Sequence, residues 1–140
     1  MKRIALRSTA LAAVALLGPV IGLSGVASAA RATAPTHLLT CASTTTKEPT
    51  SYLLSCADAN ASFASMKWSA WGSSSARGHG VLLQNDCTPN CVSGKVISYV
   101  ATVTLTNVVD TKKYGPLFSE ANFRYTSHGK TLSEKFGLAD

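Results

Sequence analysis

The sequence predicts an all-β fold, a small disulfide-stapled antiparallel β-sandwich that is immunoglobulin-like in the broad sense. Three observations predict it. Residues 95–109 alternate apolar and polar side chains and contain no glycine or proline, which is typical of a half-buried strand. About seven such short segments recur between turn-forming residues. The chain has four cysteines, and an even number in a small exported domain indicates disulfides.

The start of the chain predicts export. It opens with MKRIALR, continues with an apolar run and reaches the small residues Ala27-Ser28-Ala29. A charged start, an apolar middle and a small cleavage site form a secretory signal peptide. We therefore predict a signal peptide at residues 1–29, a flexible mature N-terminus at residues 30–36 and one β-sandwich domain at residues 37–140. The protein is expected to be secreted, extracellular or cell-wall associated.

The charge of the chain limits its partners. The formal net charge is +6, and MKRIALR carries three of the basic residues, so about +3 remains after cleavage. These charges are spread along the sequence, and only Lys112 and Lys113 are adjacent. Nucleic-acid binding requires a basic stripe, so no nucleic-acid partner is expected. No basic stop-transfer cluster follows the apolar run, which favours release from the membrane over a retained anchor.

The cysteines allow three pairings, of which we favour Cys41–Cys56 and Cys87–Cys91. HLLTC and YLLSC are similar segments that each read as a short strand ending in cysteine, with a polar loop between them. If these strands are neighbours, their cysteines can bond, and closing the loop would stabilise the fold by roughly 3 kcal/mol.

The second pair lies in NDCTPNCVSGK, which is rich in turn-forming residues. A disulfide there closes a shorter ring and contributes roughly 2 kcal/mol. A zinc site would need more soft ligands or a histidine pair, and a redox site would need CxxC in a βαβ unit. We therefore interpret this segment as a stapled turn, and we predict no metal and no cofactor.

The first half of the mature chain gives weaker signals. Residues 57–65 read as a turn or a short helical stretch. In the strand expected at residues 65–72, Met66, Trp68 and Ala70 share one face. The next expected strand, residues 73–85, places small residues at period two, which leaves room for a large neighbour, either Trp68 or Trp71.

The second half is clearer. In the strand at residues 95–109, one face carries Ile97, Tyr99, Ala101, Val103 and Leu105. TKKYGPL is expected to be a loop, and residues 117–127 form another alternating strand. Residues 127–130 read as a hairpin turn. In the last strand, residues 131–138, Leu132 and Phe136 are expected to face inward.

Part of this sequence resembles a group of small secreted actinobacterial proteins. The resemblance covers roughly residues 50 to 105. It rests on the order Cys56-Ala-Asp58-Ala-Asn60, Trp68-Ser-Ala-Trp71-Gly72, Asn85-Asp86-Cys87-Thr-Pro89-Asn-Cys91 and Gly94-Lys95. It implies an export signal and a compact β domain, and it adds no mechanism.

The sequence shows no catalytic constellation. The histidines His37, His79 and His128 are scattered, and no GxSxG motif is present. Oxygen ligands for calcium could come from Asp58, Asn60, Asn85 and Asp86. The favoured interpretation of these four residues is Asx turns beside the cysteines.

A possible binding face is predicted from the aromatic residues. Trp68 and Trp71 are three positions apart, so on a regular strand they face opposite sides. If Trp68 points inward, an exposed Trp71 near Arg77, His79 and Tyr99 could form a platform for a sugar or a protein. The alternative is that Trp71 covers the edge of the sandwich.

These observations predict a secreted, non-catalytic β domain that binds an extracellular protein or glycan at the cell envelope. The alternative is a secreted protease inhibitor. A short loop that is preorganised by its disulfide limits the entropy cost of binding, and CTPNC is such a loop.

Overall fold

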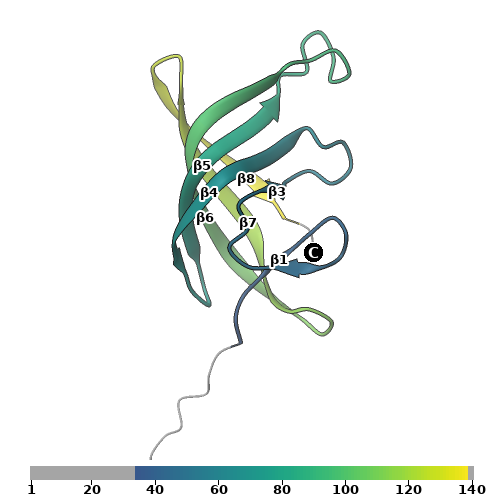
Figure 1. The fold of residues 1–140 in the computed structure, drawn as a ribbon, viewed down its shortest axis with the longest axis vertical. Helices are drawn as coiled ribbons and strands as arrows, with labels where there is room; N and C mark the ends of the chain where they lie inside the picture. Colours follow the sequence, from purple (N-terminus) through teal and green to yellow (C-terminus); the bar gives the residue numbers. More distant parts are fainter. Residues whose placement is uncertain (1–33, 139–140) are drawn as a thin grey trace, which may run out of the picture. The chain divides into compact units, whose positions relative to one another are not determined.

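The structure is a computed structural model and describes residues 34–138 (Figure 1). The predicted signal peptide, residues 1–29, lies outside the described residues, as do residues 30–33. The strands are β1 (Leu38–Leu39), β2 (Thr45–Thr46), β3 (Tyr52–Leu53), β4 (Ala61–Trp71), β5 (Ala76–Asn85), β6 (Val96–Thr111), β7 (Gly115–Ser127) and β8 (Lys130–Gly137). The predicted class is confirmed, because the described residues form two antiparallel sheets and two disulfides. Residues 34–138 include no helix with the length and hydropathy of a membrane span.

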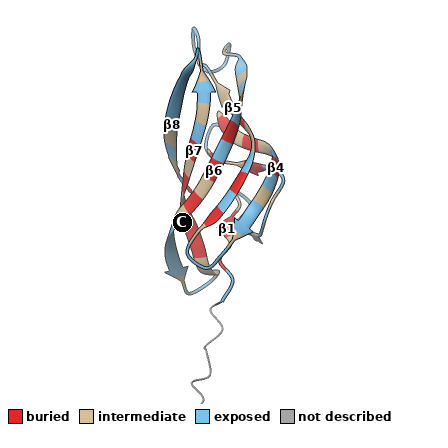
Figure 2. Cartoon of the chain, turned by 90° about the vertical axis from the view of Figure 1, so that its left-hand side faces the viewer, coloured by how far each residue is buried: buried red, intermediate tan, exposed pale blue. Residues whose placement is uncertain are grey.

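Six strands form one meander in the order β3-β4-β5-β6-β7-β8, so each strand pairs with the next along the chain. The sheet curves like part of a barrel and has an inner and an outer face (Figure 1). Buried and exposed residues alternate along its strands, as Figure 2 shows from the side where β8 to β4 lie in turn. This alternation follows from the period-two geometry of a strand, and it separates a core face from a solvent face.

The β1–β2 hairpin and the segment before it supply the second layer. Leu38 is fully buried. The amide of His37 donates to the carbonyl of Pro116 (3.1 Å), and the amide of Phe118 donates to the carbonyl of His37 (2.9 Å). Thr36, which we expected in a flexible start, is 1% exposed, and its hydroxyl donates to the carbonyl of Ser73 at 2.8 Å. The ordered domain therefore includes Thr36.

The prediction for residues 57–65 is wrong in its second half, because β4 already begins at Ala61. Phe63 is fully buried, and its ring centroid lies 5.4 Å from that of Tyr52 and 6.1 Å from that of Phe123. The alternation in this stretch is carried by alanine and serine around one phenylalanine, so its local signal is weak. Packing of Phe63 against other strands decides the conformation.

The prediction that Trp68 and Trp71 face opposite sides is also wrong. A register shift between Trp68 and Ala70 marks a bulge in β4. The extra residue of a bulge changes which side the following residues face, so both indoles pack against the core, with ring centroids 4.6 Å apart. Trp68 Nε1 donates to the carbonyl of Pro49 (3.0 Å) and Trp71 Nε1 to that of Thr36 (2.8 Å). Trp71 is therefore covered and does not form an open platform.

The small residues of β5 accommodate large side chains of β4, as predicted. A Cβ atom at Gly78 would lie 3.0 Å from the Trp68 ring, and one at Gly80 would lie 2.8 Å from the carbonyl oxygen of Ala64 and collide with the Met66 sulfur. Trp68 is thus the predicted large neighbour at Gly78, and Met66 plays the same part at Gly80.

The later strands follow the predicted pattern with two corrections. The loop expected at residues 111–117 is shorter, because β6 extends to Thr111 and β7 already begins at Gly115. Ala101, Val103 and Leu105 are buried on the inner face of β6. A hairpin turn joins β7 to β8, with His128 and Gly129 at positive φ, as tight hairpins require. Leu132, expected to face inward, remains 41% exposed. Leu132 pairs with Tyr125, the last residue of β7 that pairs with β6, so it lies where the β7–β8 hairpin begins to extend past β6.

Both predicted disulfides are present, Cys41–Cys56 and Cys87–Cys91. The strands that precede Cys41 and Cys56 are not paired with each other, because β1 pairs with β2 and β3 pairs with β4. The first disulfide therefore ties the small sheet to the large one.

The buried phenol of Tyr52 predicts a loss of stability in alkali. Its side chain is 7% exposed and its hydroxyl donates to the carbonyl of Leu39. Burial raises the pKa of Tyr52 to about 12, above about 10 in the unfolded chain. The unfolded state therefore ionises first, and stability is full below pH 10 and falls as pH rises toward 12.

At pH 11 this loss reaches about 1.4 kcal/mol. Urea unfolding at pH 9 and pH 11 measures it. Between these two pH values, the free energy of unfolding of Tyr52→Phe should fall by about 1.4 kcal/mol less than that of the wild-type protein. Tyr125, whose pKa is also raised to about 12, is present in both proteins and cancels in the comparison. Parallel losses in the two proteins would contradict the prediction.

Candidate binding groove

The register of the sheet aligns polar side chains into two rows on its outer face. The first row is Lys67, His79, Thr102, Arg124 and Ser133, one from each strand from β4 to β8. The second row is Arg77, Thr104, Asn122 and Lys135 on β5 to β8, and it is continued on β4 by Ser69, whose hydroxyl donates to the carbonyl of Arg77 at 3.2 Å. We call these the first wall and the second wall.

Two adjoining depressions lie between the walls. One, of about 330 Å³, extends from Ser69 to the middle of β6, and the other, of about 420 Å³, extends from β6 to Lys135 on β8. Thr102 and Thr104 line both. Together they form a cross-strand groove, which spans four strand intervals, or roughly 19 Å.

The floor of the groove is the row of residues that lies between the walls: Gly78, Val103, Phe123 and Glu134. Val103 and Phe123 are 1% exposed because their side chains enter the core. The Glu134 carboxylate accepts hydrogen bonds from Gln84 Nε2 (2.8 Å to each oxygen) and from the Tyr125 hydroxyl (3.0 Å). The floor is therefore mainly backbone, and the groove chemistry comes from the walls.

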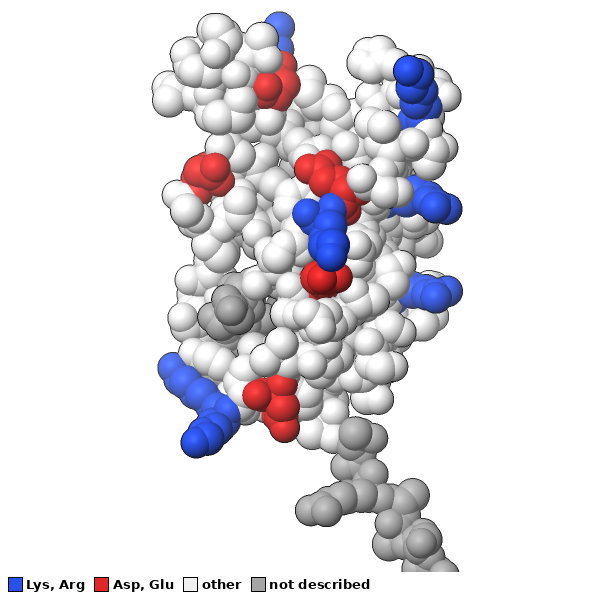
Figure 3. Space-filling view, turned by 180° about the vertical axis from the view of Figure 1, so that it is seen from behind, with Lys and Arg blue, Asp and Glu red and all other residues white. Residues whose placement is uncertain are grey.

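The walls are basic and contain no carboxylate. Lys67, Arg77 and Arg124 are exposed and make no ion pair among residues 34–138. Figure 3, seen from behind, shows basic side chains along the right-hand margin without acidic ones beside them, and basic and acidic atoms in contact near the centre.

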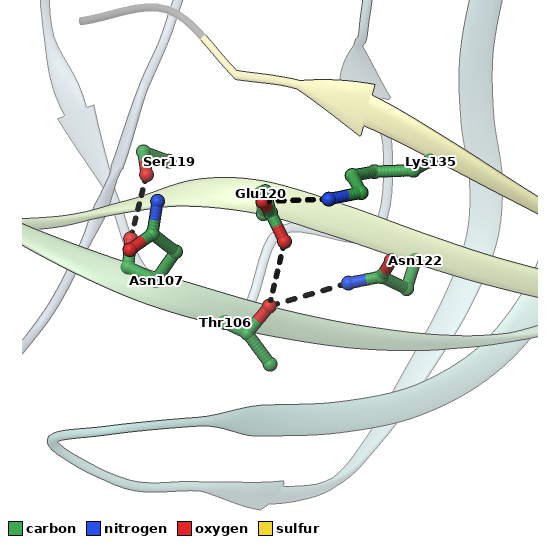
Figure 4. Close-up of polar contacts among 6 residues, drawn as sticks. All are labelled: Thr106, Asn107, Ser119, Glu120, Asn122 and Lys135. Atoms are coloured by element: carbon green, nitrogen blue, oxygen red, sulfur yellow. Dashed lines mark hydrogen bonds and ion pairs between the residues drawn. The ribbon is translucent and has the colours of Figure 1, made fainter.

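One wall cation is neutralised next to the groove (Figure 4). Lys135 Nζ lies 3.0 Å from Glu120 Oε2, and this hydrogen bond lowers the pKa of Glu120. The Thr106 hydroxyl donates to Glu120 Oε1 (3.4 Å) and accepts from Asn122 Nδ2 (3.2 Å). These contacts hold the end of the second wall in place. Among the described residues, Lys67, Arg77 and Arg124 remain as wall cations without an ion pair.

The predicted binding face of Trp71, Arg77, His79 and Tyr99 is divided between two sides of the sheet. Arg77 and His79 are exposed in the groove walls. Trp71 and Tyr99 pack against the core on the inner face. The bulge in β4 accounts for Trp71, and the alternation of β6 accounts for Tyr99.

Four side chains on the inner face of the sheet form a connected cluster: Tyr99, Tyr125, Glu134 and Gln84. The Tyr99 and Tyr125 ring centroids are 4.5 Å apart, and Tyr125 donates to Glu134. Because Gln84 on β5 and Glu134 on β8 are also hydrogen-bonded, the cluster joins two strands that are not adjacent in the sheet. It helps to hold the curvature that shapes the outer groove.

The four residues considered as calcium ligands already make hydrogen bonds within the protein. Asp58 accepts from the backbone and side-chain nitrogens of Asn60, at 3.2 and 2.8 Å. Asp86 Oδ1 accepts from the amides of Thr88 (3.0 Å) and Lys95 (2.8 Å). These backbone contacts are the main reason that the pKa values of Asp58 and Asp86 are lowered. Asn85 donates to Asn60 Oδ1 at 3.0 Å.

The other two histidines, His37 and His128, do not belong to the walls of the groove. His37 adjoins β1, where it bridges to Leu117, and His128 occupies the β7–β8 turn. The stapled loop at residues 85–95 is held by its own hydrogen bonds, such as Asn85 Nδ2 to the carbonyl of Cys91 at 2.7 Å. Val92 beside it is 99% exposed.

Another hollow, of about 530 Å³, lies beside the Cys41–Cys56 disulfide. It is lined by Tyr52, Leu53 and other uncharged residues, and the Tyr52 hydroxyl is already bonded to Leu39. We favour the groove because its wall side chains have free hydrogen-bonding groups and charge.

Sequence reasoning missed the two walls. Their basic residues are far apart in the chain, so the charge looked dispersed. The signal that was present is the period-two placement of polar residues in each strand, such as Thr102 with Thr104 and Asn122 with Arg124. Only the register between strands shows that these pairs form continuous rows.

Comparisons of the chain with protein-family models, with curated proteins and with solved structures found no match.

Proposed function

We propose that this chain is a secreted, non-catalytic domain that binds an extended glycan of the cell envelope in the cross-strand groove. The observation that carries the proposal is the groove itself, which has a backbone floor and two polar walls. Its walls offer hydroxyl, amide, imidazole and guanidinium groups, which suit the many hydroxyl groups of a sugar chain.

A glycan fits this surface better than a protein segment. Protein interfaces have an apolar, aromatic-rich centre, whereas the walls contain no Phe, Tyr, Trp, Leu, Ile, Val or Met side chain. An extended peptide commonly adds to a free sheet edge. The groove crosses the middle of the sheet, where the backbone of β5, β6 and β7 is already paired.

Secretion is supported by the export signal in the sequence and by the two disulfides, which form and persist in oxidising compartments. A domain exported across a bacterial membrane meets cell-wall polymers first. Such polymers are extended, as the groove requires.

The proposal is tested with a substitution that fills the groove without changing its charge. Thr104→Tyr places a bulky residue that strands accept well at the point shared by both depressions. Ser98→Tyr is the matched control, because Ser98 is exposed on the outer face of the same strand but does not line the groove. Co-sedimentation with isolated cell-wall material measures binding.

We expect the wild-type protein and Ser98→Tyr to sediment alike, and Thr104→Tyr to bind about tenfold more weakly, a difference of about 1.4 kcal/mol. Equal binding by all three proteins would exclude the groove as the site. Failure of the wild-type protein to sediment with any wall preparation would overturn the proposed function.

A further inference from the structure

We infer that the ligand of the groove is an acidic glycan, with anionic groups roughly 10 Å apart and uncharged sugar hydroxyls between them. This inference rests on the proposed function, because it concerns the same groove and specifies the chemistry of its ligand.

The two arginines that line the depressions lie on both sides of the groove centre. Arg77 on β5 belongs to the second wall, and Arg124 on β7 belongs to the first. Both side chains are exposed and make no ion pair within the described part of the chain. Two strand intervals separate β5 from β7, which is roughly 10 Å. Two anions at this spacing can therefore each meet a guanidinium group.

The centre of the groove is neutral. β6 lies between the arginines and contributes only Thr102 and Thr104 to the walls. Hydroxyl groups donate and accept single hydrogen bonds, which matches uncharged sugar hydroxyls. The pattern across the groove is thus cation, hydroxyl, cation.

The walls favour a charged glycan over a neutral one. A neutral sugar chain gains affinity by burying the apolar faces of its rings, and that gain needs apolar surface in the site. The two tryptophans pack in the core, and the ring that the walls do expose is the polar imidazole of His79, which offers little apolar surface. Hydrogen bonds between ions are roughly twice as strong as neutral ones, and a guanidinium group can bind a carboxylate or a phosphate in a bidentate manner.

The same features argue against a nucleic acid. A nucleic-acid strand carries a phosphate roughly every 3.4 Å along the axis, and single strands are held by stacking of their bases on aromatic side chains. Two arginines separated by neutral threonines, with no exposed ring between them, do not match that charge density.

Isothermal titration calorimetry tests the inference with three defined polymers at low salt. Hyaluronan carries a carboxylate on alternate sugars, poly(glycerol phosphate) carries phosphodiesters, and dextran is neutral. Oligo(dT) serves as a polyanion that is not a glycan and whose phosphates lie closer together than the inference requires. The groove variant is Arg77→Gln/Arg124→Gln. The matched control is Lys95→Gln/Lys130→Gln, which removes the same charge from exposed residues outside the groove.

We expect the wild-type protein to bind at least one acidic polymer ten- to a hundredfold more tightly than dextran or oligo(dT). The polymer that binds better identifies the anion as carboxylate or phosphate. The groove variant should lose at least tenfold in affinity and show a flatter salt dependence, whereas the control should change less than threefold.

Two results would overturn the inference and leave the proposed function intact. One is binding of dextran as tight as that of the acidic polymers, with Thr104→Tyr still blocking it. The other is wall binding that both double variants retain equally. Oligo(dT) binding equal to that of the acidic polymers would also overturn it, because charge alone would then explain the affinity. If Thr104→Tyr binds cell walls as well as the wild-type protein, the proposed function itself fails.

Discussion

Truncating Phe63 to alanine is expected to destabilise the domain by about 3–5 kcal/mol, the range for a large aromatic residue in a packed core. Phe63 is fully buried near the start of β4. Its ring contacts three others, those of Tyr52, Trp68 and Phe123, with centroids 5.4, 6.0 and 6.1 Å away. The cavity would lie where β3, β4 and β7 meet, and the surrounding strands are held by their ladders and cannot collapse into it.

The midpoint of urea unfolding measures this effect. Phe136→Ala is the control, because it removes the same side chain from β8 at the edge of the sheet, where the ring is only partly buried. Phe136→Ala should lower the free energy of unfolding clearly less than Phe63→Ala does. If Phe63→Ala does not fold, Phe63→Leu should still fold with a smaller loss, since it keeps most of the side-chain volume. Equal losses for the two alanine variants would contradict the packing described here.

Removing the Cys41–Cys56 disulfide, as Cys41→Ala/Cys56→Ala, should destabilise the domain by about 3 kcal/mol. The bond closes a loop of sequence separation 15 and connects the two-stranded sheet to the six-stranded one. For a domain of this size the melting temperature should fall by roughly 12–20 °C. The β1–β2 hairpin should open first, because the lost bond is its covalent link to the six-stranded sheet.

The other disulfide provides the comparison. Cys87→Ala/Cys91→Ala opens a ring of sequence separation 4, and the expected loss is about 2 kcal/mol. Its loop also keeps the hydrogen bonds of Asn85 and Asp86. Calorimetry of the two variants should therefore rank the first below the second in melting temperature. The reverse order would show that the N-terminal hairpin is held mainly by other contacts.

Local sequence patterns predicted the strands in which apolar and polar residues alternate without interruption. They failed where one inserted residue or one contact with a distant strand determines the conformation. β6 could be predicted because its β-branched residues alternate with apolar ones without interruption. Trp71 could not, because the bulge before Ala70 has no clear sequence signal and reverses the direction of the side chain. The start of β4 was missed since a single phenylalanine, Phe63, obtains its partners from other strands.

Less of the candidate site than of the fold could be predicted from local sequence patterns. The sequence placed Arg77 and His79 in one possible binding face, and both are exposed on the outer face of β5. It could not place Arg124 or Lys135 beside them, because register between strands depends on the pairing of whole hairpins. A charge that is evenly spread along the chain became a basic surface through folding.

The strict alternation along β5 to β8 also divides the positions that recognise a ligand from the positions that maintain the fold. Wall residues such as Thr104 and Arg124 point to solvent, while their chain neighbours Val103 and Phe123 fill the core. Exchanges at exposed wall positions therefore cost little stability, generally within about 0.5 kcal/mol. Descendants of this chain can acquire a different binding preference by successive substitutions on one side of the sheet, and each intermediate keeps an unaltered interior.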